Sequence, residues 1–253
     1  MRYKLTISYD GAYFYGFQRQ KNLISVQEEI EKALTIIMKE PITINGSGRT
    51  DSGVHAIGQV IDFKTNQNVP CKNLIKIMNK RLYPHIYVKD ACIVDDRFHS
   101  RIYATKKEYH YKVSLNTFDP LKANYIYFFH DRINISNIRK AMELLIGEHD
   151  FRSFAKTKEE DNTIRTIESF TLDINDGVLT FKIVGNGFMR NMVRIIVAVM
   201  LRVGEGKLTV DDVKRILDAK SRDAAPWVAP AQGLYLYKVY YVLAFPASVT
   251  WQP

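Results

Sequence analysis

The chain has 253 residues, of which 46% are hydrophobic, 12% aromatic and 25% charged, with glycine and proline scattered along it. This composition excludes disordered, collagen-like and low-complexity chains, and the length suffices for one large or two modest domains with a buried core. The 36 Lys and Arg residues exceed the 27 Asp and Glu residues, and the resulting net charge of +9 favours a polyanionic partner.

The first hundred residues predict alternating strands and helices. Alternation of apolar and polar residues predicts strands at 3–8, 42–45, 59–64 and 86–94. Helical spacing predicts one helix from Ser25, with Glu28 completing a capping box, to Pro41, and a second opened by Pro70. The order β-α-β-β-α-β is that of the split βαβ, or ferredoxin-like, arrangement, in which two helices cover one face of an antiparallel sheet.

The second half follows a related plan with longer elements. We predict a strand at 109–115, a helix from Ile138 that ends at Gly147, and a hairpin turned at Asp176-Gly177. A long helix from about Met189, an amphipathic helix at 209–219 and a final strand at 234–242 follow. We therefore expect an α+β fold of two halves, residues 1–103 and 104–245, with a tail at 246–253 and a cleft between their sheets.

The segment from Asn45 to His55 places three glycines around Arg49 and Asp51. Glycine permits close backbone approach, so such a loop can hold Asp51 against a ligand as nucleophile, general base or metal ligand. The alternative is a polar turn between two strands. A phosphate-binding P-loop is disfavoured because the Gly-Lys-Ser/Thr ending is missing, and a serine hydrolase because no Gly-x-Ser-x-Gly is present. The six histidines lack the paired spacing of a metal site, so we expect no metal.

Two arginines precede the apolar run from Ile195 to Leu201. Arg190 and Arg194 would occupy the first turns of the long helix, where a cation opposes the helix dipole and a buried guanidinium needs an anion. Asp51 or a phosphate would satisfy Arg194 and, in the first case, keep the carboxylate ionised for catalysis. Pairing with another acidic side chain is the alternative.

Aromatic residues give a third signal. Four of them crowd the segment after the first strand (Tyr13, Phe14, Tyr15 and Phe17), and Tyr109 and Tyr111 lie on a strand near several cations. Rings beside basic side chains suit stacked bases and backbone phosphates, although aromatics that alternate on a strand are usually part of the core. Together with the net charge, the pattern favours RNA.

Several blocks, in order along nearly the whole chain, resemble the tRNA pseudouridine synthase A family. They are YKLTISYDG at 3–11, FYGFQRQ at 14–20, GSGRTDSGVHAIGQV at 46–60, FHSR at 98–101, YHY at 109–111, GEHDF at 147–151, FMRNMVR at 188–194 and GLYL at 233–236. Lys107 and Glu108 depart from the pair of basic residues that relatives often have there.

The resemblance implies two ferredoxin-like halves with mainly antiparallel sheets that meet at a basic catalytic cleft. It implies a homodimer that isomerises uridine to pseudouridine at positions 38, 39 and 40 of tRNA, in the anticodon stem-loop, without a cofactor or metal. Residue by residue, it implies that Asp51 is the catalytic aspartate and that Arg194 pairs with it. It also implies that Tyr109 stacks on the uracil, Arg49 contacts the tRNA or helps displace the base, and Leu236 lines the base pocket.

Two other classes of protein remain as alternatives. A non-catalytic RNA-binding module of the same fold would explain the charge and the rings but not Asp51 in its glycine-rich loop. A metal-dependent nuclease would need clustered carboxylates or histidines. The two cysteines, Cys71 and Cys92, and the absence of a signal-peptide pattern predict a reducing cytoplasm, and no apolar run reaches the length of a membrane span.

Overall fold

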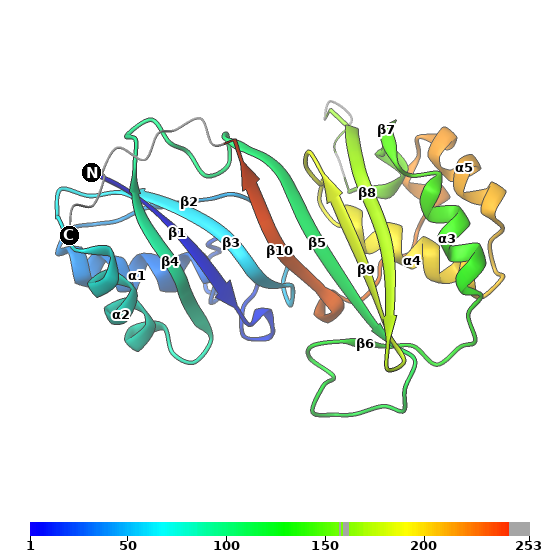
Figure 1. Cartoon of the computed structure of the whole chain (residues 1–253), viewed down its shortest axis with the longest axis horizontal. Helices are drawn as coiled ribbons and strands as arrows, with labels where there is room; N and C mark the ends of the chain where they lie inside the picture. Colours follow the sequence, from blue (N-terminus) through cyan, green and yellow to red (C-terminus); the bar gives the residue numbers. More distant parts are fainter. Residues whose placement is uncertain (157, 159–161, 243–253) are drawn as a thin grey trace. The chain divides into compact units, whose positions relative to one another are not determined.

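The computed structural model describes residues 1–156, 158 and 162–242, and they form a mixed α/β fold with mostly antiparallel strand pairs. The chain divides into two compact units (Figure 1). Unit 1 comprises Met1–Thr105 and the segment from Leu236 on, and unit 2 comprises Lys106–Tyr235. The sequence-based division at 103 lies close to this break, but the last strand belongs with unit 1 and not with the second half. The predicted tail at 246–253 lies outside the described residues.

Unit 1 has the element order β-α-β-β-α-β that the sequence predicts. Its elements are β1 (Arg2–Tyr9), η1 (Gly11–Tyr13), α1 (Val26–Met38), β2 (Ile44–Gly46), β3 (His55–Lys64), α2 (Cys71–Leu82) and β4 (Ile86–Val94), with most of β10 (Leu234–Tyr241). The strand order is β4-β1-β3, with β2 and β10 both beside β3. β1 pairs antiparallel with both of its neighbours. Both helices lie on one face of this sheet (Figure 1).

Helix α1 shows how local sequence sets these elements. Ser25 caps its N-terminus by accepting a hydrogen bond from the Glu28 N–H at 3.3 Å. The Glu28 carboxylate contacts Lys32 at 3.0 Å instead of completing the predicted capping box. The helix ends at Met38, before the predicted stop at Pro41, because Lys39 adopts a left-handed conformation with φ of +56°. Its inward side chains, Ile30 and Leu34 among them, are fully buried.

Unit 2 consists of a mostly antiparallel sheet with helices on one face (Figure 1). Its elements are β5 (Ala104–Ser114), β6 (Tyr127–Phe128), α3 (Ile135–Glu143), β7 (Gly147–Asp150), η2 (Arg152–Phe154), β8 (Ile164–Asn175), β9 (Val178–Gly185), α4 (Met192–Gly204), α5 (Val210–Ala219), η3 (Arg222–Ala224) and η4 (Ala231–Gly233). The strand order is β5-β9-β8-β7, and the short β6 runs parallel to β5. Strands β6 and β7 are absent from the sequence-based prediction.

The predicted hairpin between β8 and β9 is confirmed. Asp176 and Gly177 both have positive φ, +49° and +73°, as a two-residue type I′ turn requires. The long helix is also confirmed, but α4 begins at Met192 because Asn191 has φ of +61°. Arg190 therefore precedes the helix, which corrects its predicted place in the first turn. From Ile195 to Leu201 every residue of α4 is buried, as the apolar run predicts.

Candidate active site

The glycine-rich loop that carries Asp51 connects β2 to β3 and is fixed at its start by two buried side chains. Ser47 is fully buried, and its hydroxyl donates to Gln59 Oε1 at 2.6 Å. The Gln59 amide donates in turn to the Gly48 carbonyl at 2.8 Å. Because both partners are buried, each hydrogen bond would be costly to leave unmade. The first residues of the loop are therefore held against β3.

A buried carboxylate fixes the strand that leads into this loop. Asp62 on β3 is fully buried and accepts hydrogen bonds from the Asn45 side chain at 3.0 Å and the Ser100 N–H at 2.7 Å. It also pairs with Arg2. The Ser100 hydroxyl donates to the Asn45 carbonyl at 3.0 Å, and Tyr241 Oη donates to the Ser100 carbonyl at 2.7 Å. The network joins β1, β2, β3, β10 and the segment at 98–101 just ahead of Gly46.

The middle of the loop is held through Thr50. Its hydroxyl shares a 2.8 Å hydrogen bond with the buried Tyr9 hydroxyl, and its carbonyl accepts from the Phe17 N–H at 3.1 Å. Burial raises the pKa of Tyr9, so the phenol stays protonated for this bond. Of the two neighbours of Thr50, Arg49 is exposed and Asp51 is half-buried. Asp51 thus sits on a fixed backbone with part of its surface open to a ligand.

Two glycines let the chain turn after Asp51. The Val54 N–H donates to the Asp51 carbonyl at 3.2 Å and closes a β-turn in which Gly53 has φ of +79°. Gly16, with φ of +95°, packs against this turn, and a Cβ there would lie 2.9 Å from the Thr50 carbonyl oxygen. A side chain at either position would strain the backbone, and one at residue 16 would also push the loop away.

His55, at the end of the loop, has a structural role. Its ring is 2% exposed, and Nδ1 accepts a hydrogen bond from the Gly11 N–H at 3.0 Å and lies 3.3 Å from Asp10 Oδ1. For His55, this agrees with the expectation of a hydrogen-bonded residue. In the part of the chain that the structure describes, no three His, Cys, Asp or Glu side chains cluster as a metal site would need.

In unit 2, Tyr109 is mostly buried on β5, opposite Ile183 of β9. Phe188 meets its ring edge-on, with the ring centroids 5.3 Å apart and the planes at 82°. Tyr111, two residues on and on the same face, is fully buried and donates from Oη to the Pro230 carbonyl at 2.7 Å. The ring of Tyr109 therefore has a fixed orientation. The sequence did not single out Phe188 as its partner.

Arg194, in the first turn of α4, is half-buried. Its Nε donates to the Ala229 carbonyl at 2.7 Å, while its own carbonyl accepts from the Ala229 N–H at 3.1 Å. Nη1 also donates to Asn191 Oδ1 at 3.3 Å. The guanidinium is thus oriented by Asn191 and by the buried Ala229, and the sequence singled out neither residue.

Leu236 is fully buried on β10, where the chain enters unit 1. Of the five predicted site residues, Arg49, Asp51 and Leu236 belong to unit 1, and Tyr109 and Arg194 belong to unit 2. Each group is described within its own unit, so the pairing of Asp51 with Arg194 stays a prediction.

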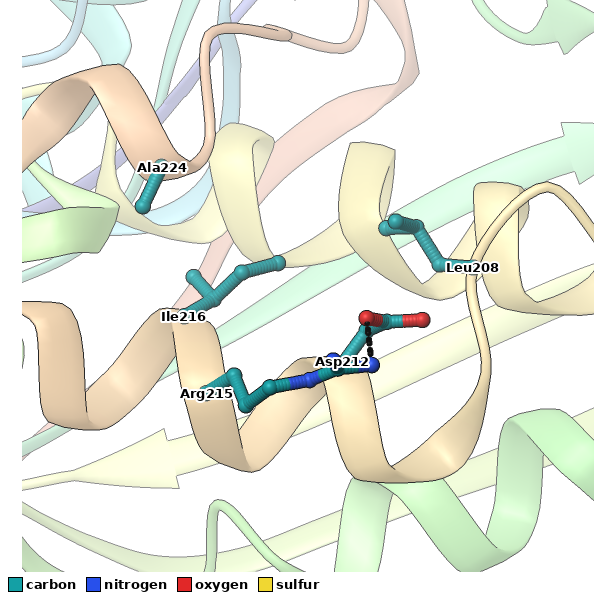
Figure 2. A pocket seen from close by; sticks show the side chains of 5 residues that line it. All are labelled: Leu208, Asp212, Arg215, Ile216 and Ala224. Atoms are coloured by element: carbon teal, nitrogen blue, oxygen red, sulfur yellow. Dashed lines mark hydrogen bonds and ion pairs between the residues drawn. The ribbon is translucent and has the colours of Figure 1, made fainter.

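Two hollows in unit 2 contain none of these residues. One, of about 280 Å³, lies beside α5 and is lined by Leu208, Asp212, Arg215, Ile216 and Ala224 (Figure 2). The charged side chains of this hollow already bind other protein groups: Asp212 forms the capping box of α5 with Thr209 and an ion pair with Arg215. The other, of about 330 Å³, is bordered by the Arg202 guanidinium stacked on Trp227 at 4.2 Å. Neither offers a carboxylate in a glycine-rich loop.

Comparisons with known proteins identify the class to which this chain belongs. The family of tRNA pseudouridine synthases matches residues 5–102 and 141–242, which include every predicted site residue except Tyr109. The tRNA pseudouridine synthase A of Bacillus subtilis (strain 168) is 47% identical over 246 residues, which cover 95% of this chain and 99% of the relative. The enzymes of that name from Thermosipho melanesiensis and Geobacillus sp. (strain WCH70) are 44% and 42% identical, with 95% of this chain covered in each case and 99% and 98% of the relatives.

The chain belongs to the tRNA pseudouridine synthase family, whose members are isomerases that convert uridine to pseudouridine in tRNA. No helix in the described ranges is long and apolar enough to span a membrane.

Proposed function

We propose that this chain isomerises uridine to pseudouridine at positions 38, 39 and 40 of tRNA, in the anticodon stem-loop, with Asp51 as the catalytic carboxylate. The carrying observation is the environment of Asp51. It is half-buried on a loop anchored by the Ser47–Gln59 and Tyr9–Thr50 hydrogen bonds, and the turn after it depends on Gly53. Such anchoring lowers the cost of placing a carboxylate against a sugar carbon.

The reaction needs few groups from the protein. The bond from ribose C1′ to N1 of uracil breaks, the base turns, C5 bonds to C1′, and the hydrogen of C5 leaves to solvent while N1 regains a proton. An ionised carboxylate can assist by adding to C1′ or by removing the proton at C2′. Nothing is oxidised or hydrolysed. A glycoside hydrolase, by contrast, generally uses two carboxyl groups that flank the bond.

The other predicted residues have roles that fit their surroundings. The target base must leave its stack, at a cost of a few kcal/mol, before a carboxylate can reach its sugar. We assign Tyr109, whose ring is set by Phe188, to stacking on the uracil, and the buried Leu236 to the wall of the base pocket. We assign Arg194 to pairing with Asp51, and the exposed Arg49 to contacting the tRNA or displacing the base.

The proposal extends to the architecture. We propose two ferredoxin-like halves that meet at a basic catalytic cleft in a cytoplasmic homodimer. For unit 1, the strand order β4-β1-β3 with β2 beside β3, and two helices on one face, supports the ferredoxin-like arrangement. The net charge of +9 suits a tRNA partner.

Tritium release tests the activity. Transcripts of tRNA that carry tritium at C5 of uridine are incubated with the purified full chain in EDTA, without nucleotide. We expect the label to pass to water, because C5 becomes the glycosidic carbon. Mapping of the product is expected to place pseudouridine at positions 38 to 40. Binding of tRNA without release of label would reject the activity and favour the non-catalytic RNA-binding module.

The predicted ion pair between Asp51 and Arg194 is tested by a double-mutant cycle. Arg194→Ala is expected to lower the rate of isomerisation about 100-fold, as the loss of an oriented charged group does at other sites. The cycle compares the unfolding free energies of Arg194→Ala, Asp51→Asn and the double variant. The lost bond to Ala229 cancels in this comparison, so we expect a coupling of about 1 kcal/mol or more. If the two substitutions change the unfolding free energy in a strictly additive way, the ion pair between Asp51 and Arg194 is rejected.

A further inference from the structure

The aromatic segment after β1 alternates between buried and exposed rings. Phe14 and Phe17 are 6% and 3% exposed and pack near Tyr9, whereas Tyr13 and Tyr15 are each 54% exposed. The two phenylalanines therefore anchor the segment in the core of unit 1. The two tyrosines present their rings to solvent, at a cost in exposed apolar area that folding does not explain.

Backbone contacts fix this segment to the loop of Asp51. The Phe14 carbonyl accepts from the Gly53 N–H at 3.4 Å, and the Phe17 N–H donates to Thr50 as described above. A Cβ at Gly11 would overlap the Val54 carbonyl, and one at Gly16 would press on Thr50. Tyr13 and Tyr15 thus alternate with residues that touch residues 50–54. The segment that carries the two exposed rings therefore borders the loop of Asp51.

One of the rings is also held from behind. Tyr13 stacks on His85, which follows α2, with ring centroids 3.5 Å apart and the planes at 27°. The His85 ring meets the Phe14 ring edge-on, with the ring centroids 6.4 Å apart. The main-chain carbonyl of His85 accepts a hydrogen bond from the Asp10 N–H at 2.9 Å. A ring with one face covered and half its surface open is preorganised to receive another flat group on the open side.

We infer that the Tyr13–His85 stack, with Tyr15 beside it, is a platform on which an unpaired base of the RNA substrate stacks next to the nucleotide that enters the site. The inference rests on the proposed function and adds a contact outside the catalytic residues. A stacked ring is tolerant of base identity, so the platform contributes to affinity for unpaired RNA.

Charge around the platform favours RNA over a protein partner. Arg49 and Lys21 are exposed on the segments that flank it, and the Arg19 side chain is 57% exposed although it pairs with Glu31. The acidic neighbour, Asp10, is largely covered and directed to His55. Basic side chains beside exposed rings suit a nucleic acid backbone with splayed bases.

The test uses the full chain and measures affinity apart from chemistry. Tyr13→Ala is expected to weaken binding of unmodified tRNA about 5-fold or more, the lower end of what one base–ring stack contributes, while the single-turnover rate at saturating enzyme stays within about twofold. Tyr13→Trp keeps a ring and is expected to bind like the wild type. Tyr15→Ala is expected to act like Tyr13→Ala, more weakly because no ring among the described residues stacks on Tyr15.

A matched control is Ile36→Ala. Ile36 is 56% exposed, and it lies on α1 ten residues beyond Val26, about 15 Å along the helix axis from the end that contacts residues 16 and 17. It should bind tRNA normally. Unchanged tRNA affinity of Tyr13→Ala would overturn the platform. So would a variant that binds tRNA normally but no longer associates with a second copy of the chain. Loss of turnover at saturation would reassign Tyr13 to the chemistry. Absence of activity in the wild type would instead reject the proposed function. The tRNA affinities of the wild type and Tyr13→Ala would then decide the platform independently.

Discussion

Replacement of Asp51 by asparagine is expected to lower pseudouridine formation about 10⁴-fold or more, as removal of a group that acts directly on the substrate does in other enzymes. Asparagine keeps the shape of the side chain and removes only its charge. The loop should stay in place, because its anchors are Ser47, Gln59, Thr50 and the Asp51 carbonyl, none of which changes. Affinity for tRNA should therefore remain within about twofold.

Tritium release and direct binding to tRNA together check this prediction. Ser52→Ala serves as the control in the same turn, since Ser52 is exposed and its hydroxyl donates a long hydrogen bond of 3.4 Å to the Phe14 carbonyl. The control should react at nearly the wild-type rate. If Asp51→Asn binds tRNA poorly, or loses far more unfolding free energy than the about 1 kcal/mol expected for its ion pair with Arg194, Asp51 is a structural residue and the catalytic assignment fails.

The second large effect concerns stability. Asp62→Ala is expected to lower the unfolding free energy by about 3–5 kcal/mol, the range found when one partner is removed from a buried ion pair. The substitution would strip the Ser100 N–H and the Asn45 amide of their acceptor and leave Arg2, 13% exposed, without its carboxylate. Each buried donor left without an acceptor lowers the unfolding free energy further.

Denaturant unfolding of the full chain measures this effect, with Asp96→Ala as the matched control. Asp96 pairs with Lys64 at 2.6 Å, but the two side chains are 66% and 53% exposed, so its loss should cost less than about 1 kcal/mol. If Asp62→Ala lowers the unfolding free energy no more than Asp96→Ala does, the buried network does not support the fold. Activity measured below the melting temperature should fall as well, because the network sits directly ahead of the loop that carries Asp51.

Local signals in the sequence predicted most of the elements. Period-2 alternation located β1 and β4, the Ser25 side chain marked the start of α1, and Asp176-Gly177 predicted the hairpin. Each of these depends on residues within a few positions of one another. The start of α4 was misplaced by three residues because Asn191, a residue type that tolerates positive φ, breaks a run that otherwise looks helical.

Contacts between distant residues could not be predicted in this way. Strand β10 carries an ordinary alternating pattern, and nothing in it indicates pairing with β3 some 180 residues earlier, so it was assigned to the second half of the chain. The short β6 and β7 offer too few residues to show a period.

The candidate site shows the same division. The glycines around Asp51 are visible as a motif, and the structure explains Gly53 by its positive φ. The groups that hold the loop are less visible: Tyr9 bonds to Thr50 across 41 positions, and Ala229 orients Arg194 across 35. An alanine that acts through its main chain leaves no chemical signature in a sequence.

The return of β10 to unit 1 has a consequence for synthesis on the ribosome. Strand β3, which leads out of the loop of Asp51, has β10 as a neighbour, and Gly58 has no Cβ so that the Tyr237 carbonyl can approach it. At about 5–20 residues per second, roughly 7 to 27 seconds separate translation of Thr105 from that of Tyr241. During that interval the nascent unit exposes the strand edge that β10 later covers, which is a site for chaperone binding or misassociation between chains. A fragment cut at the domain break would keep that edge permanently, so a complete unit 1 requires the whole chain to be synthesised.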